Sequence, residues 1–142
     1  FTELPNQLSR LKKLEQLAIA HNDLKEINKS LAKLRRLQVL YAHHNRISQL
    51  PAELQQLKSL LTLDLGYNWF STAPAVLSAL PNLEELDLNN NNLQEFPTVL
   101  LSIRTLKTVY LGSNPLWGRE GLQSPYAAHI KQLEANNTQV TY

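Results

Sequence analysis

The sequence predicts a right-handed α/β solenoid, in which short parallel strands line a concave side and short helices or 3-10 turns line a convex side. Leucines recur every 23 residues, and each is followed by the same pattern of apolar and polar positions. A unit of this length cannot bury its own leucines, so neighbouring units must stack into one continuous core. The recurring leucines are Leu14, Leu37, Leu60, Leu83 and Leu106.

The first half of each repeat predicts a short strand. In the segment from Leu83 to Leu88, apolar and polar residues alternate near the end, which is the two-residue period of a strand with one buried face. Leu86 and Leu88 are expected to point inward, whereas Glu85 and Asp87 point outward. An asparagine follows each strand, and the stacked amides can bond turn backbone groups that would otherwise be buried without partners. The asparagines are Asn22, Asn45, Asn68, Asn91 and Asn114.

The second half of each repeat predicts a short helix or 3-10 turn. In the clearest copy, Leu54 and Leu57 follow Leu50 at steps of three to four residues, which suits one buried helical face. Pro51 is expected at the first helical position, where its missing N–H would have no helical partner anyway. The equivalents of Pro51 in the other repeats are Pro5, Pro74 and Pro97, and Asn28 replaces it once.

The repeat pattern ends after Leu116, and residues 117–142 predict a C-terminal cap made of a helix and a strand. Ser124 is the expected N-cap of this helix, and Pro125 is its expected first residue. Trp117 is expected to pack beneath the cap rather than to bind a ligand. The apolar stripe of the helix comprises Tyr126, Ile130 and Leu133, and the last strand is expected from Thr138 to Tyr142.

The repeats also define the predicted organisation of the chain. Phe1 occupies the position that Leu24 holds one repeat later, so residues 1–13 read as a half-repeat and we expect the sequence to be a piece of a longer protein. Any targeting segment would then lie upstream. The repeat region covers residues 1–116, with repeats that start at residues 14, 37, 60, 83 and 106, and the cap covers residues 117–142.

These motifs resemble the leucine-rich repeat family over roughly residues 1–116. The 23-residue form with Leu-Pro-x-x-Leu-x-x-Leu is similar to the group that includes Ras-pathway scaffolds, plant intracellular Ras-group proteins and many bacterial proteins. The resemblance implies a non-catalytic scaffold that binds a protein partner through the concave strand face. The partner is unidentified, because the variable outward positions determine which protein binds.

Composition and missing motifs exclude several classes of function. With 43% hydrophobic and 18% charged residues the chain is expected to be globular, and no apolar run approaches the ~18 residues that would predict membrane insertion. Cysteine is absent, which excludes thiol catalysis, disulfide-stapled caps and zinc–cysteine sites, and favours the cytoplasm over secretion. No Gly-rich phosphate loop, His-Glu-x-x-His or Gly-x-Ser-x-Gly motif occurs, so we expect no enzymatic activity, cofactor or small-molecule substrate.

The outward strand positions contain the candidate binding residues. Asp64 and Asp87 occupy the same position in adjacent repeats and are expected ~5 Å apart on neighbouring strands, with Glu85 beside them. Tyr41 and Tyr110 occupy that position on either side, so the row predicts an acidic floor between two aromatic residues, suited to a partner's Lys or Arg. The alternative is a solvated polar face that water and Lys107 screen.

Histidines form a second candidate group. His43 and His44 follow the second strand, and His21 shares a column with His44, so two imidazoles could approach one ion. No carboxylate shares that column, and we therefore assign no metal site. A contact whose strength changes with pH and a plain surface feature remain as alternatives.

Two aromatic residues stand at the rim of the third repeat. Tyr67 and Trp69 follow the third strand at its exposed turn. Exposed aromatic residues beside a groove are typical anchors of protein interfaces, so both are predicted to contact the partner. The alternative is that Trp69 shields the turn against its neighbours.

Two further classes of function compete with protein recognition. The repeats could be a structural spacer or mount for a domain outside this sequence, and their N-terminal end could pair two copies end to end; otherwise we expect a monomer. A basic ridge near the strand entrances could bind a polyanion, although it lacks the interleaved aromatic residues typical of nucleic-acid binding. The ridge comprises Arg10, Lys12, Lys13, Lys33, Arg35, Arg36 and Lys58.

Overall fold

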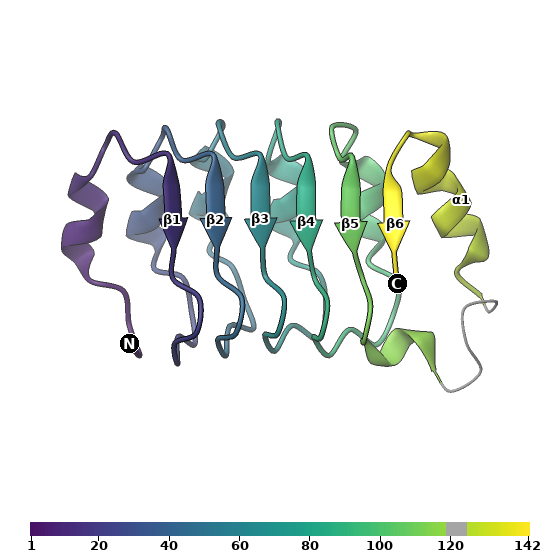
Figure 1. The fold of residues 1–142 in the computed structure, drawn as a ribbon. Coiled ribbons are helices and arrows are strands. Elements are labelled where there is room, and N and C mark those ends of the chain that lie inside the picture. Colours follow the sequence, from purple (N-terminus) through teal and green to yellow (C-terminus); the bar gives the residue numbers. More distant parts are fainter. Residues whose placement is uncertain (119–124) are drawn as a thin grey trace.

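The computed structural model describes residues 1–118 and 125–142, and its central element is one sheet of six parallel strands in sequence order (Figure 1). Each strand is three residues long, and β1 to β5 are each followed by a turn that contains one of the repeated asparagines. The strands are β1 (Gln16–Ala18), β2 (Val39–Tyr41), β3 (Thr62–Asp64), β4 (Glu85–Asp87), β5 (Thr108–Tyr110) and β6 (Gln139–Thr141).

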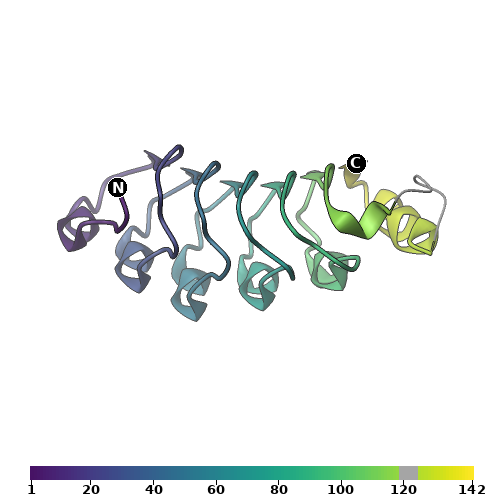
Figure 2. The same cartoon turned by 90° about the horizontal axis from the view of Figure 1, so that it is seen from below.

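Short 3-10 helices, labelled η, connect successive strands on the side opposite the sheet. Figure 2 shows the strands along the inner side of a shallow arc and the helical segments along its outer side, so the predicted solenoid is confirmed. The helices are η1 (Asn6–Arg10), η2 (Lys29–Lys33), η3 (Ala52–Gln56), η4 (Ala75–Ala79), η5 (Thr98–Ser102), η6 (Pro115–Trp117) and the α-helix α1 (Ala127–Ala135).

One continuous apolar core fills the space between the two layers. Leu40, Leu63 and Leu86 lie in register on β2, β3 and β4, and all three side chains are fully buried. Leu54 and Leu77 reach the same core from η3 and η4. Every repeat contributes leucines from both layers. Each repeat therefore buries its leucines against the adjacent repeats.

A ladder of buried asparagines joins consecutive repeats. The side-chain amide of Asn45 donates to the carbonyl oxygens of Ile19 (2.9 Å) and Ala42 (3.1 Å), and its oxygen accepts from the backbone N–H of Leu24 (3.0 Å). Asn22, in the first repeat, is half-buried; its amide donates only to carbonyls of its own turn among the described residues, and its oxygen accepts from the N-terminal amine of Phe1 at 2.6 Å. The same bonds recur at Asn68, Asn91 and Asn114, which confirms the predicted role of the column.

The prolines lie one position earlier than expected. Pro51 is the N-cap of η3 rather than its first helical residue, with extended backbone angles of φ −68° and ψ 143°. Its carbonyl oxygen accepts the first bond of the turn, from the N–H of Leu54 at 3.1 Å. A proline tolerates this position because φ is already near its fixed value and no N–H is required. The carbonyl oxygen of Asn28, which replaces proline once, accepts the equivalent bond from the N–H of Leu31 at 3.0 Å, and its side chain also accepts from the N–H of Ser30.

The C-terminal helix and strand form the predicted cap. The helix α1 begins at Ala127 with Tyr126 as its N-cap, so the expected start at Pro125 is two residues early; Ser124 lies outside the described residues. Trp117 donates from Nε1 to the carbonyl oxygen of Leu111 (2.7 Å) and packs 5.1 Å from the ring of Tyr142. Among the described residues, no helix is long and apolar enough to cross a membrane.

Candidate binding surface on the strand face

Four predicted site residues form one row across the outer face of the sheet. The strand register places Tyr41 opposite Asp64, Asp64 opposite Asp87, and Asp87 opposite Tyr110. Tyr41 is 41% exposed, whereas the other three are half-buried. Glu85 lies two residues before Asp87 on β4 and is exposed on the same face. The sequence prediction that these residues come together is correct.

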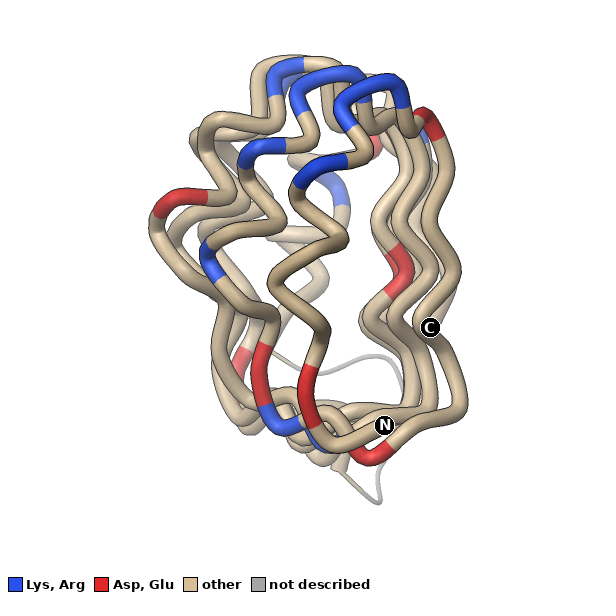
Figure 3. The backbone as a smooth tube through the Cα atoms, turned by 90° about the vertical axis from the view of Figure 1, so that its left-hand side faces the viewer, with Lys and Arg blue, Asp and Glu red and all other residues tan. Residues whose placement is uncertain are grey.

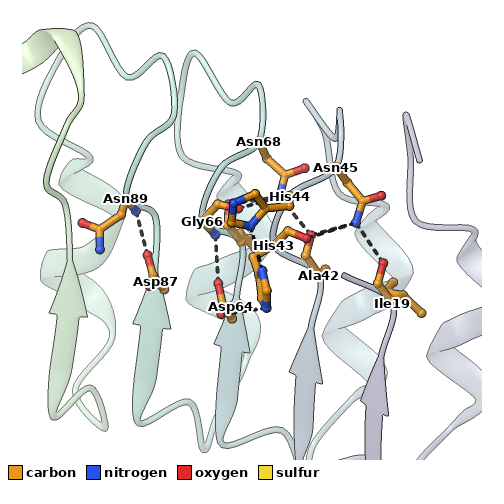
Figure 4. Close-up of polar contacts among 11 residues, drawn as sticks. Ile19, Ala42, His43, His44, Asn45, Asp64, Gly66, Asn68, Asp87 and Asn89 are labelled. Atoms are coloured by element: carbon orange, nitrogen blue, oxygen red, sulfur yellow. Dashed lines mark hydrogen bonds and ion pairs between the residues drawn. The ribbon is translucent and has the colours of Figure 1, made fainter. Parts of the chain in front are cut away.

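Both aspartates are held by the turns that follow their strands. Oδ1 of Asp64 accepts from the N–H of Gly66 at 3.0 Å, and Oδ1 of Asp87 accepts from the N–H of Asn89 at 2.8 Å (Figure 4). A Cβ atom at Gly66 would lie 3.2 Å from Oδ1 of Asp87 and 3.3 Å from Oδ1 of Asp64. Glycine at this position therefore leaves room for two carboxylates on adjacent strands.

The surroundings of Asp87 disfavour its charged form. Partial burial is the largest cause that raises the pKa of this carboxyl above its ordinary 3.8, and the charges of Asp64 and Glu85 raise it further. The hydrogen bond from Asn89 and the charge of His43 oppose that rise. A partner's cation at this point would relieve an unfavourable concentration of negative charge.

Screening of the acidic row by Lys107 is not what the structure shows. Nζ of Lys107 lies 3.0 Å from Oε1 of Glu84, which is not part of the row. Among the described residues, the basic side chain found close to the two aspartates is His43, whose Nε2 lies 3.9 Å from Oδ2 of Asp64 and which bears a positive charge only when it is protonated. The row therefore keeps its negative character within the described chain.

The histidines form a compact cluster at the edge of this row. The rings of His21 and His44 stack at 4.3 Å, and the ring of His44 stacks on Tyr67 at 4.1 Å. His43 packs edge-on against both histidines, and its Nδ1 lies 2.9 Å from Nδ1 of His44. Figure 4 shows His43 reaching from the turn after β2 toward Asp64.

Repetition of one backbone turn produces this stack. His21, His44 and Tyr67 all have left-handed backbone angles, with φ between 53° and 57°. Because the same turn recurs in each repeat, equivalent side chains project in parallel and meet across the repeat spacing. The shared column of His21 and His44 follows from the sequence, whereas the approach of Asp64, from another column, to His43 does not. No spacing in the sequence encodes this approach, because it depends on how the His43 side chain turns across columns.

The cluster also affects the protonation of His44. Desolvation by the neighbouring side chains is the largest cause that lowers the pKa of His44, and the charges that His21 and His43 would carry lower it further. The charge of Asp64 opposes this change. The geometry thus favours neutral imidazole at this edge.

Tyr67 and Trp69 are both exposed but have different neighbours. Tyr67 is 51% exposed and stacks on His44, which places it beside the row. Trp69 is 58% exposed, and the guanidinium of Arg46 lies 5.8 Å from its ring centroid. Arg46 is itself paired with Asp23 at 2.9 Å. Tyr67 is therefore part of the histidine cluster, whereas Trp69 packs beside Arg46 and not against the histidines.

The basic side chains gather at the opposite end of the strands. Figure 3 shows many of the Lys and Arg residues along the edge where the chain enters successive strands, whereas Asp and Glu are spread over the strand face, the helical side and the opposite edge. Arg36 pairs with Glu15 at 3.1 Å, and Arg35 donates to Gln56 at 3.0 Å. The predicted ridge therefore exists, with part of its charge already engaged within the protein.

Comparison with known proteins identifies similar solenoids. Residues 12–70 match the family model described as Leucine rich repeat, and residues 82–103 match a second model described as Leucine Rich Repeat. No curated protein matches the chain. A leucine-rich repeat protein of Leptospira interrogans is similar in structure, with a TM-score of 0.86 and 28% identity, over 100% of this chain and 34% of that one.

Two plant receptor kinase structures are also similar. The ectodomain of GASSHO1/SCHENGEN3 from Arabidopsis thaliana, solved with CASPARIAN STRIP INTEGRITY FACTOR 2, has 32% identity and a TM-score of 0.67 over 79% of this chain and 14% of that one. The Arabidopsis receptor kinase HAESA, solved with the peptide hormone IDA and the co-receptor SERK1, has 29% identity and a TM-score of 0.66 over 79% and 20%. The chain spans about a third or less of these proteins.

Proposed function

The chain belongs to the leucine-rich repeat family, and we propose that it is a non-catalytic scaffold that binds a protein partner through the outer face of its sheet. Members of this family are generally binding scaffolds, and two of the similar structures are receptor complexes with peptide or protein ligands. The observation that carries the proposal is the row of Tyr41, Asp64, Asp87 and Tyr110 on four adjacent strands.

The row suits a basic segment of a partner. Each aspartate gives Oδ1 to its own turn, so its second carboxylate oxygen can accept from a partner's Lys or Arg, although Oδ2 of Asp64 also lies 3.9 Å from Nε2 of His43. Tyr41 and Tyr110 add contact area at a low cost in side-chain entropy. The strands and the asparagine ladder hold these groups in place before binding. Binding therefore loses little conformational entropy of the scaffold.

Capture of a partner by matched variants tests this proposal. Replacing both aspartates by alanine is expected to abolish binding, but alanine also removes the bonds to Gly66 and Asn89. The double variant Asp64→Asn, Asp87→Asn removes the charges while each amide oxygen can still accept its turn N–H. The control is Glu3→Gln, Glu26→Gln, which makes the same charge change at exposed residues away from the row.

The outcome separates recognition by this row from general charge attraction. We expect wild type and the glutamate control to capture the same protein from lysate or extracellular fluid, and the aspartate variant to lose it. Equal capture by all three folded proteins would exclude the acidic row as the binding surface and would favour the structural-mount alternative.

A second candidate function is polyanion binding along the basic ridge. The alignment of Lys and Arg at the strand entrances supports it (Figure 3). If the ridge binds polyanions, retention on heparin should fall steeply with salt and should weaken in the double variant Lys12→Gln, Lys13→Gln. Failure to bind heparin at low salt would exclude this function.

A further inference from the structure

Three of the four histidines of the chain converge at the turns that follow β1 and β2, and we propose that His21, His43 and His44 bind one divalent transition-metal ion of the zinc type. One nitrogen from each ring lies within 4.8 Å of the other two. Imidazole nitrogen suits Zn²⁺, Cu²⁺ and Ni²⁺, whereas Ca²⁺ and Mg²⁺ require oxygen ligands. The site goes beyond partner binding and does not depend on it.

The spacing of the rings is close to that of a metal-binding set. A Zn–N distance of ~2.0–2.1 Å in tetrahedral geometry places ligand nitrogens ~3.3 Å apart. The Nδ1 atoms of His43 and His44 are already 2.9 Å apart, and His21 stacks on His44. Because His21 and His44 are exposed, their rings can tilt toward a shared ion without a backbone change. Three protein ligands leave the fourth position to water.

A carboxylate supports the least exposed ligand. If Nδ1 of His43 binds the ion, its Nε2 faces Oδ2 of Asp64 at 3.9 Å (Figure 4). Metal-bound histidines in proteins commonly direct their other ring nitrogen to a carboxylate, which fixes the ring and its tautomer. Asp64 is in turn held by the N–H of Gly66 at 3.0 Å. Asp64 is therefore a positioning residue rather than a ligand.

The left-handed turn alone does not account for these side chains. Histidine tolerates such backbone angles, but Asn90 and Ser113 occupy the same position of the turn with similar φ. His43 lies outside the left-handed position and still turns its ring toward His44. The turn forms equally well with Asn90 or Ser113 at the position of His21 and His44, so the backbone does not require histidine there. The three rings therefore converge because of the side chains themselves.

Isothermal titration of ZnCl₂ into the tag-free, metal-depleted protein tests the site. We expect saturable binding of one ion per chain, and visible absorption of bound Co²⁺ should report fourfold coordination. The double variant His43→Asn, His44→Asn copies the natural pair Asn89–Asn90 of the fourth repeat, so it should fold and lose the binding. His129→Gln, a change far along the chain in α1, should retain it.

The positioning role of Asp64 has its own readout. Asp64→Asn should weaken Zn²⁺ binding by ~10- to 100-fold while the unfolding midpoint of the metal-free protein stays near that of wild type. Asp87→Asn removes the same charge one strand away and should weaken binding much less. Equal effects of the two variants would contradict the orientation of His43 by Asp64.

Three results would overturn the metal site. One is the absence of saturable binding by wild type up to ~100 µM Zn²⁺. Another is undiminished binding by the folded His43→Asn, His44→Asn variant. The third is half an ion per chain with a dimer by light scattering, because the histidines would then bridge two copies rather than form a site within one.

Discussion

The second and fourth repeats, residues 37–59 and 83–105, share a backbone but present different chemistry on the strand face. Their turns have nearly the same left-handed angle, φ 55° at His44 and 53° at Asn90. The second repeat presents Tyr41 and two histidines at positions where the fourth presents Asp87 and two asparagines.

Inward residues explain why the backbone is the same in both. Leu40 and Leu86 are fully buried at equivalent strand positions, and Asn45 and Asn91 make equivalent bonds to the preceding repeat. These interactions are made by residues other than the outward side chains. The inward residues of a repeat therefore provide its stability, whereas the outward residues of the same repeat determine what it can recognise.

The largest effect is expected from the strand leucines. Leu40→Ala and Leu86→Ala should each destabilise the protein by about 3 kcal/mol, because each leaves a cavity among fully buried leucines. Urea unfolding monitored by circular dichroism measures both. If one of these two variants lost several times more stability than the other, Leu40 and Leu86 would not have equivalent roles.

The asparagine ladder should give the next largest effect. Asn45→Ala and Asn91→Ala should each cost about 2 kcal/mol, since buried carbonyl oxygens and one N–H lose their partners. Asn22→Ala should cost less, because Asn22 is only half-buried. The unfolding midpoints of the three variants measure these losses. If Asn22→Ala destabilised the protein as much as the other two, the bonds between repeats would not explain the effect.

The acidic row should lower the free energy of unfolding by a small amount that depends on pH. Asp87→Asn should stabilise the protein at neutral pH by a few tenths to about 1 kcal/mol, because it removes a like charge across the strands. The pKa of Asp87 is raised in the folded protein, so as pH rises above 3.8 the unfolded chain releases this proton first and wild-type stability falls.

That difference between wild type and variant should therefore vanish at low pH. Urea unfolding of both proteins at about pH 3 and at neutral pH tests the sign. Glu26→Gln, at an exposed residue away from the row, is the control and should show no such gain. A gain that is larger in acid than at neutral pH would contradict the account.

The smallest effect is expected from exchanging the turn pairs. Replacing His43 and His44 by asparagine should change the unfolding free energy by less than about 0.5 kcal/mol without metal, because the fourth repeat holds the same turn with Asn89 and Asn90. Thermal unfolding in EDTA measures it. A marked destabilisation would show that the histidine stack supports the fold.

Most of the fold was predictable because the buried columns are periodic. Leu40, Leu63 and Leu86 recur at one interval, and that interval alone predicts strand register and the pairing of Asp64 with Asp87. The start of α1 was less predictable, because the cap occurs once and no repeat corrects an error there.

The site was predictable only in part. Register brings Tyr41, Asp64 and Asp87 into one row, so sequence spacing was sufficient for them. The approach of His43 to Asp64 depends on side-chain rotation across columns, which no spacing encodes. The same holds for Lys107, which pairs with Glu84 on the neighbouring repeat rather than with the row.

The most direct test of recognition through the strand face is hydroxyl-radical footprinting of the protein with its captured partner. We predict that the partner protects Tyr41, Tyr67 and Tyr110 from oxidation, since all three lie on or beside the row. Leu11, which is 52% exposed away from the row, should react equally with and without partner. Protection of Leu11 with unchanged oxidation of the three tyrosines would contradict the account.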